Sequence, residues 1–343
     1  MQRTFSRALT MALLGLVLVS VCGTALAQYS LTALTSNQKG KAKNIDPLLV
    51  NAWGMAYAPG APFWVSDEGN GWSTLYNGAG KPQSLQVIVP SATGKGSGTP
   101  TGLAYNGSNQ FQIDSWTSLF LFATLDGTIQ GWSHFDPSET LIAVNNNGSG
   151  ASYTGIAVTA HSSGNFLYAT DFANNKIDVY DGNFSFVKSF TDSGIPNGFN
   201  PFNVEDINGM LYVTYAATSG GPGGYVDIFQ EDGTLVKELI KGKPLNQPWG
   251  LAMAPKNFGT LSNTLLVGND NNKTSTINAF NPSTGKFVGT IKDKTGKPIK
   301  IDQLWAIEFG GGSSANGKKN QLYFTAGPNN SAGGLFGVIA AAK

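Results

Sequence analysis

A short phrase with a fixed order of apolar and small residues recurs six times along the chain. Its third position is always apolar, and the six copies are Trp53–Ala56, Thr101–Ala104, Thr154–Ala157, Phe202–Glu205, Trp249–Ala252 and Trp305–Glu308. Successive copies lie 47 to 56 residues apart. Repeats of roughly 40–50 residues are typical of β-propellers, in which each repeat forms one four-stranded blade. The spacing therefore predicts six blades, each opened by this phrase.

Each phrase is followed by further segments with strand character. Runs rich in β-branched and aromatic residues predict a second strand in every repeat, at 63–66, 121–124, 167–170, 211–214, 265–268 and 322–325. A third strand follows in every repeat, but a fourth is found only in the first five, at 85–89, 141–144, 186–190, 235–240 and 287–291. The sixth repeat reaches Lys343 without one.

The missing strand has a counterpart at the other end of the chain. Residues 29–35 alternate in polarity and precede the first repeat with nothing local to pair with. Pairing them with the sixth repeat would close the ring and leave no open sheet edge at the junction. We therefore predict an all-β, six-bladed β-propeller of four-stranded blades, in which the N-terminus supplies the outer strand of the last blade.

Residues 1–27 have the pattern of a secretory signal peptide. Arg3 and Arg7 precede an apolar stretch, and Ala25-Leu26-Ala27 fits the small-x-small cleavage rule. Lipidation at Cys22 is the alternative, disfavoured by the Val before it. We expect cleavage before Gln28, a secreted or periplasmic protein, and one propeller domain over residues 28–343.

Removing that segment changes the composition. The single Cys and both Arg leave with it, so 20 Lys face 21 acidic residues and no Arg remains. A slightly acidic chain without Arg argues against nucleic-acid binding. No later segment is apolar enough for a membrane span, and we expect a monomer.

One repeat also indicates a family. Gly155–Val158 followed by 167–181, which reads Leu-Tyr-Ala-Thr-Asp-Phe-Ala-Asn-Asn-Lys-Ile-Asp-Val-Tyr-Asp, resembles an NHL-type repeat. Over residues 45–340 the chain is similar to exported bacterial six-bladed propellers without assigned activity. The first two repeats carry insertions, and the fourth and sixth depart from the Gly-x-Ala pattern. NHL-like folds include protein-binding modules, lactone- and ester-hydrolysing metalloenzymes and a zinc-dependent lyase, so the resemblance implies a fold and leaves the activity open.

Two repeats differ from the others at the fourth position of the phrase. Glu205 and Glu308 replace an Ala there, and Asn203 replaces a Gly in the fourth repeat. The opening strand of a propeller blade is innermost, so these oxygens should face the central channel. They predict a site for a hard divalent cation, calcium above all. The structural alternative is that both carboxylates bond backbone amides or channel waters.

A second polar group follows the second strands, where loops line one rim of the channel. Its members are predicted ligand-binding residues: Asp67, Glu68, Trp72, Asp171, Asn269 and Asp270. Asp171 and Asn269 also fit turn caps, and Asp67-Glu68 fits a solvated loop pair.

Aromatic residues form a third group. Trp53, Phe202, Trp249 and Trp305 share one position of the phrase, and packing between blades is their expected role. Trp72 and Trp116 fall in loops, where flat exposed rings beside Asn and Asp would suit a carbohydrate ligand.

No complete catalytic motif accompanies these groups. The two histidines, His134 and His161, both lie outside the phrase, so a three-His zinc site is not available. A Gly-x-Ser-x-Gly elbow, HExxH and a P-loop are also absent. The sequence favours a non-catalytic scaffold that binds a ligand or a protein partner. The alternative is a calcium-dependent lactone or ester hydrolase with its site in the channel.

Overall fold

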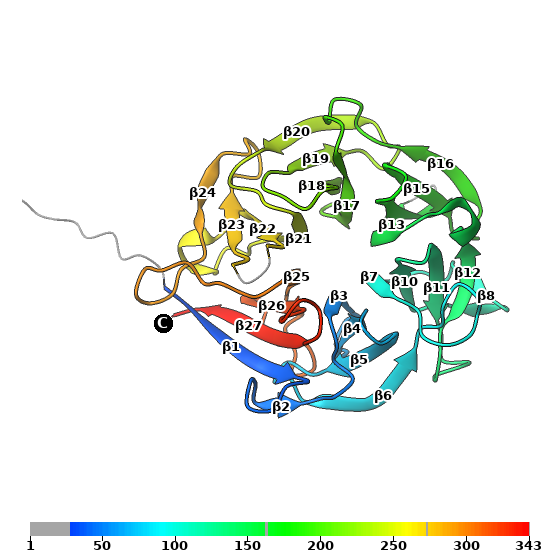
Figure 1. Ribbon diagram of the computed structural model, residues 1–343, viewed down its shortest axis with the longest axis horizontal. Coiled ribbons are helices and arrows are strands. Elements are labelled where there is room, and N and C mark those ends of the chain that lie inside the picture. The colour runs from blue at the N-terminus through cyan, green and yellow to red at the C-terminus, as the bar shows by residue number, and fades with distance from the viewer. Residues whose placement is uncertain (1–27, 162–163, 272–273, 343) are drawn as a thin grey trace, which may run out of the picture.

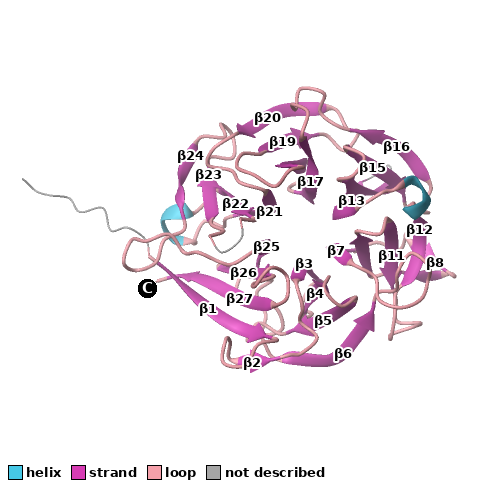
Figure 2. Cartoon of the chain, viewed as in Figure 1, coloured by secondary structure: helices cyan, strands magenta, loops and turns pink. Residues whose placement is uncertain are grey.

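The apolar strands and polar turns close into a ring of six antiparallel sheets, the blades of a β-propeller (Figure 1). The computed structural model describes residues 28–161, 164–271 and 274–342, and the predicted signal peptide lies outside them. Figure 2 shows strands throughout the ring, with short helical turns at Asn147–Ser149 and Gly259–Leu261 on its periphery.

Each blade runs outward from the axis in chain order. Blade one holds β3 (Ala52–Tyr57), β4 (Phe63–Asp67), β5 (Trp72–Tyr76) and β6 (Pro82–Ile88). Blade two holds β7 (Pro100–Tyr105), β10 (Phe120–Thr124), β11 (Thr128–Trp132) and β12 (Leu141–Asn145). Blade three holds β13 (Tyr153–His161), β14 (Gly164–Asp171), β15 (Lys176–Asp181) and β16 (Phe186–Phe190).

The remaining blades follow the same plan. Blade four holds β17 (Phe199–Asp206), β18 (Leu211–Ala217), β19 (Tyr225–Phe229) and β20 (Leu235–Lys241). Blade five holds β21 (Pro248–Met253), β22 (Leu265–Asn269), β23 (Ile277–Phe280) and β24 (Phe287–Thr290). Blade six holds β25 (Leu304–Phe309), β26 (Gln321–Ala326) and β27 (Leu335–Ala341), and its outer strand is β1 (Tyr29–Ser36).

The N-terminal strand closes the ring, as predicted. β1 pairs antiparallel with β27, from Tyr29 opposite Ala341 to Ser36 opposite Leu335. Tyr29 also ties the junction to blade five, because its hydroxyl donates to the Phe258 carbonyl at 2.7 Å. A short strand that was not predicted, β2 (Asn44–Ile45), pairs parallel to β1.

A second addition lies in blade two. The residues between β7 and β10 form a small hairpin of β8 (Gln112–Ile113) and β9 (Trp116–Thr117). Trp116, expected in a loop, therefore belongs to a two-residue strand.

The apolar core is divided into layers between neighbouring blades. One cluster, which includes Phe120, joins blades one and two, another joins blades three and four, and a third joins blades five and six. A further cluster, which includes Val65, joins blades one and six and continues to the axis, where it contains the rings of Phe202 and Trp249. Each sheet buries its two faces against its two neighbours, which is how a ring of sheets removes apolar surface from water.

The glycine of the repeated phrase has a packing role. Neighbouring inner strands come so close here that a Cβ on Gly102 would lie 2.7 Å from the backbone nitrogen of Ile156. A Cβ on Gly250 would lie 2.6 Å from the carbonyl oxygen of Trp305. Gly therefore recurs in four of the six phrases because these blades present bare backbone to the next one, whereas Asn203 and Ala306 stand at this position in blades four and six.

Candidate functional site

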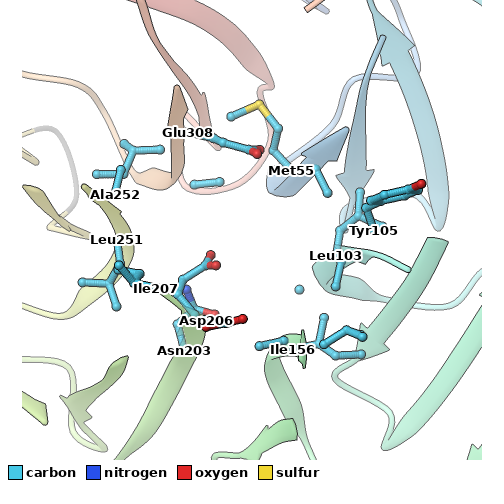
Figure 3. A pocket seen from close by; sticks show the side chains of 18 of the residues that line it. Met55, Leu103, Tyr105, Ile156, Asn203, Asp206, Ile207, Leu251, Ala252 and Glu308 are labelled. Atoms are coloured by element: carbon cyan, nitrogen blue, oxygen red, sulfur yellow. The ribbon is translucent and has the colours of Figure 1, made fainter. Parts of the chain in front are cut away.

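The six inner strands enclose a cavity of about 400 Å³ on the propeller axis. All six contribute residues, most of them from the third position of the phrase onward, such as Met55, Leu103, Ile156 and Leu251. These positions lie toward the end of each strand, so the cavity occupies one half of the channel. Most of the residues that line it are apolar (Figure 3), although polar atoms make up the larger part of its exposed surface.

The other half of the channel is filled by aromatic rings. Trp53 lies 6.4 Å from both Phe202 and Trp249, measured between ring centroids, and stacks on Trp305. All four side chains are buried. Trp249 also lines the cavity, whereas Phe172, from the loop after β14, packs against Phe202 from the other direction. The rings thus separate the cavity from the opposite rim.

Glu205, Glu308 and Asn203 all line the cavity, as the phrase predicted for a channel site. In Figure 3, Glu308 extends from β25 on one side, while Asn203 and Asp206 extend from β17 on another. Asn203 is buried, and its amide donates to the Trp249 carbonyl at 3.1 Å. The structure therefore brings oxygen atoms from blades four and six to one open space.

Burial changes the acidity of both glutamates. Both side chains line a cavity that admits water, but they are otherwise enclosed by protein. This partial loss of hydration raises the pKa of Glu205 to about 8. The charge of nearby Asp206 contributes to this increase, and a hydrogen bond from Asn203 opposes it. Burial and then the charge of Glu205 hold the pKa of Glu308 well above its usual value. The Oε2 atom of Glu308 is enclosed and has no hydrogen-bond partner among the described residues.

The predicted rim residues lie at the opposite end of the blades. Asp67 pairs with Ala52 at the start of β3, and Asn269 pairs with Pro248 at the start of β21. Glu308, in contrast, pairs with Tyr323 near the end of β25. A rim Asp therefore lies too far along the strands to join Glu205 and Glu308 around one cation.

Three of the rim residues are buried within their own blades. The carboxylate of Asp171 accepts hydrogen bonds from the backbone nitrogens of Ser152 and Asn174, which is the turn-cap role. Asn269 similarly accepts from the Asn246 nitrogen at 2.8 Å. Asp67 accepts from Thr74 at 2.8 Å, and burial raises its pKa well above the usual value. Their side chains support loops and do not reach the solvent.

Glu68 and Asp270 are more accessible but do not meet. Glu68 accepts a hydrogen bond from the Asn51 amide at 2.6 Å. Asp270 belongs to blade five, and burial, followed by the charge of Asp302, raises its pKa to about 7. The rim group is therefore spread over separate blades.

The two tryptophans that were expected in loops, Trp72 and Trp116, begin the short strands β5 and β9 and lie apart from the channel. Trp72 lines a shallow groove with Ile88 and Pro137 between blades one and two. Trp116 is 49% exposed and stacks on Phe135, with centroids 5.1 Å apart. A carbohydrate ligand at these rings stays a prediction.

Several cavity residues were not identified from the sequence. Tyr57, Tyr105, Asp206 and Phe309 line the cavity one residue beyond the repeated phrase. The Tyr57 hydroxyl donates to the Phe309 carbonyl at 3.0 Å, and burial, then the charge of Glu308, raises its pKa to about 12. Extending the phrase by one position would have revealed this group, because it holds a second acid next to Glu205.

Two further buried acids lie close together: Asp227 of blade four and Asp192 of the loop before that blade. Asp227 of β19 is completely buried, and neither carboxylate oxygen has a hydrogen-bond partner among the described residues. Burial, and next the charge of Asp192, raise its pKa to about 8. At the equivalent place in blade three, Lys176 forms an ion pair with Asp178 at 2.9 Å. Blade four has no such cation, so Asp227 is held in its protonated form.

The described residues show no ready-made metal centre. Nowhere in 28–161, 164–271 or 274–342 are three or more His, Cys, Asp or Glu side chains grouped to hold a metal ion. In the same ranges no helix has the length and apolar character needed to cross a bilayer.

Solved structures of similar shape are β-propellers. Virginiamycin B lyase from Staphylococcus aureus superposes with a TM-score of 0.57 at 11% identity, covering 92% of this chain and 100% of that one. A luciferin-regenerating enzyme gives 0.54, also at 11% identity, covering 85% and 92%. Likeness at this identity shows the fold alone. The chain is thus a six-bladed β-propeller with an acidic cavity on its axis.

No family model matches the chain. Its sequence is 31% identical over 337 residues to uncharacterized protein R648 of Acanthamoeba polyphaga mimivirus, covering 92% of this chain and 81% of that protein. It is 29% identical to uncharacterized protein L690 of the same virus, covering 92% and 86%. The chain belongs to the family of R648. These relatives are viral, so the bacterial exported family and the NHL-type repeat stay predictions.

Proposed function

We propose that this propeller is a binding protein whose central cavity receives a small molecule. The observation that supports this most directly is the cavity itself, closed on one side by aromatic rings and supplied with acidic groups from two blades. Its volume of about 400 Å³ lies within the range of small-molecule sites, roughly 300–1,000 Å³. Most of its lining residues are apolar and a few are charged or polar, which is also typical of such sites.

The cavity is a better candidate than the opposite rim. Asp67, Asp171 and Asn269 are buried and hydrogen-bonded within their own blades, so a ligand on that face would not reach them. The cavity glutamates face an open space that admits water.

A cavity-filling variant tests the proposal. Ala104 lines the cavity at the phrase position that Glu205 and Glu308 occupy in their blades, so Ala104→Phe should fill part of it. We expect fragments that raise the melting temperature of the wild type to lose this effect in Ala104→Phe. The control, Ala79→Phe in an exposed turn, should bind them unchanged. Equal binding by all three proteins would place the site elsewhere.

A calcium-dependent lactone or ester hydrolase is the second candidate. It is favoured by the convergence of Glu205, Glu308 and Asn203 on one open cavity. Calcium takes six to eight oxygen ligands, so water or backbone oxygens would have to complete the set. A bound cation would polarise a carbonyl or activate water.

The hydrolase has its own test. Calcium should raise the melting temperature of the wild type but not of Glu205→Gln, and the wild type should cleave phenyl acetate or a simple lactone only with calcium present. Identical melting curves in calcium and in chelator would remove this candidate and leave the binding protein.

A further inference from the structure

The acids of the cavity have no cationic partner. Glu205, Asp206 and Glu308 line it, and its described lining contains no Lys, Arg or His. In the described ranges, the ion pairs are those that Lys176 forms with Asp171 and Asp178, in blade three. Carboxylates that are withdrawn from bulk water need either a proton or a positive charge.

The hydrogen bonds around Glu308 are also incomplete. Its Oε2 atom is enclosed without a donor among the described residues. Glu308 is close enough to Tyr57 for its charge to help raise the pKa of that hydroxyl, yet the Tyr57 hydroxyl donates its proton to the Phe309 carbonyl at 3.0 Å. Glu205 differs, because the Asn203 amide provides it with a hydrogen bond. Glu308 is therefore the group with the most to gain from a charged donor.

The walls indicate what else the ligand carries. Beside the acids, the lining includes the apolar side chains of five residues: Met55, Leu103, Ile156, Leu251 and Phe309. A bare calcium ion gains nothing from apolar side chains and requires six to eight oxygens. No grouping of three or more His, Cys, Asp or Glu in the described part of the chain is arranged for a metal. An organic cation, in contrast, would use both the acids and the apolar wall.

We propose that the cavity binds a small organic cation, an ammonium group on an apolar body, with Glu308 as its main anchor and Glu205 as its second. This rests on the proposed function and names the chemical class of its ligand. The ammonium lies between blades four and six, and the apolar body lies against the inner strands of blades one, two, three and five.

Three probes of matched size and different charge test the assignment. Benzylammonium, benzyl alcohol and benzoate are titrated into the wild-type protein at low salt, with binding measured by calorimetry or ligand-observed NMR. We expect the cation to bind at least about tenfold more tightly than benzyl alcohol, and benzoate to bind least, since a charge-assisted contact is stronger than a neutral one.

Two isosteric variants locate the anchor. Glu308→Gln should weaken binding of the cation by about tenfold or more and leave binding of benzyl alcohol unchanged. Glu205→Gln should weaken binding of the cation to a smaller extent. Asp232→Asn, at an exposed turn, is the matched control and should bind all three probes as the wild type does. Circular dichroism and melting curves confirm that each variant is folded.

The possible failures are distinguishable. If benzyl alcohol or benzoate binds as well as the cation, or if both Gln variants bind the cation normally, the organic-cation assignment is overturned and the cavity remains a binding site. Calcium binding that Glu308→Gln abolishes, without binding of the ammonium probe, overturns it in favour of a metal. If no probe of any charge binds and Ala104→Phe changes nothing, the proposed function fails as well.

Discussion

Trp53 and Trp305 stack with their ring centroids 3.6 Å apart and their planes inclined by 15°, joining the first blade to the last near the axis. The Trp305 indole also donates to Asn51 Oδ1 at 3.0 Å, and the Asn51 amide donates to Glu68. One aromatic contact thus links the junction of the ring to the loop that bears Glu68.

Replacement of the Trp305 ring should destabilise the folded protein. We expect Trp305→Ala to lower the free energy of unfolding by about 3–5 kcal/mol, because it leaves a cavity among packed rings and removes the partner of Asn51. Chemical denaturation measures the change. Trp116→Ala, on an exposed ring, should stay within about 0.5 kcal/mol of the wild type. Equal losses in the two variants would contradict a structural role for the axial rings.

Removal of the N-terminal strand should weaken the ring as a whole. Without residues 28–36, β27 becomes an open edge and the contact of Tyr29 with blade five is lost. Several kcal/mol of lost stability corresponds to a fall in melting temperature of about 10 °C or more. Tyr29→Phe keeps the strand and removes one hydrogen bond, so it should cost only about 1 kcal/mol. An unchanged melting temperature in the truncated protein would show that the ring closes without this strand.

The close approach of inner strands predicts the effect of a single methyl group. A Cβ on Gly54 would lie 2.9 Å from the backbone nitrogen of Leu103, and backbone cannot move aside as a flexible side chain does. We expect Gly54→Ala to destabilise the protein by about 1–3 kcal/mol through overpacking. Gly148→Ala is the control, because nothing lies within 4 Å of its Cβ. Similar stability of the two variants would mean that the blades are less tightly opposed than the structure shows.

The buried acid of blade four predicts that stability falls as pH rises. Burial, then Asp192 and more weakly Glu238, raise the pKa of Asp227 to about 8, whereas in the unfolded chain it is near 3.8. Tyr215, itself buried beside Asp192, supplies no positive charge. The folded state therefore holds a proton that the unfolded chain has lost between these two pH values. Its stabilising effect is complete below about pH 4 and is lost as the pH rises through about 8, at up to about 1.4 kcal/mol per pH unit.

Melting curves between pH 5 and 8.5 measure this effect. The wild type should become less stable as the pH rises, and Asp227→Asn should reduce the slope. Part of the slope should remain, because Glu205, Glu308 and Asp270 also have raised pKa values. Asp232→Asn should leave the slope unchanged, since its pKa is lowered by hydrogen bonds from Thr234 and it is ionised throughout this range. A slope in Asp227→Asn equal to that of the wild type would count against the assignment.

The architecture could be predicted from the sequence because it depends on local, repeated features. The phrase has Gly54, Gly102, Gly155 and Gly250 in four of its six copies because these blades meet the next blade through a close backbone approach. The incomplete sixth repeat and the unpaired segment before the first one were enough to identify the closing strand β1. The position of Glu205 and Glu308 on the channel followed from the same register.

The surroundings of each acidic side chain, which the register along one strand does not specify, were decided by the tertiary structure. Asp67 and Glu308 are both acids near the end of a strand. Only the folded ring shows that the Asp67 side chain is buried within its own blade, whereas the Glu308 side chain faces the cavity. Likewise, Asp178 has a lysine partner and Asp227 has none, although both occupy the third strand of a blade. The sequence alone determined the repeated backbone contacts, which are local; the environment of each charge depends on neighbours that are distant along the chain, and only the closed ring brings these together.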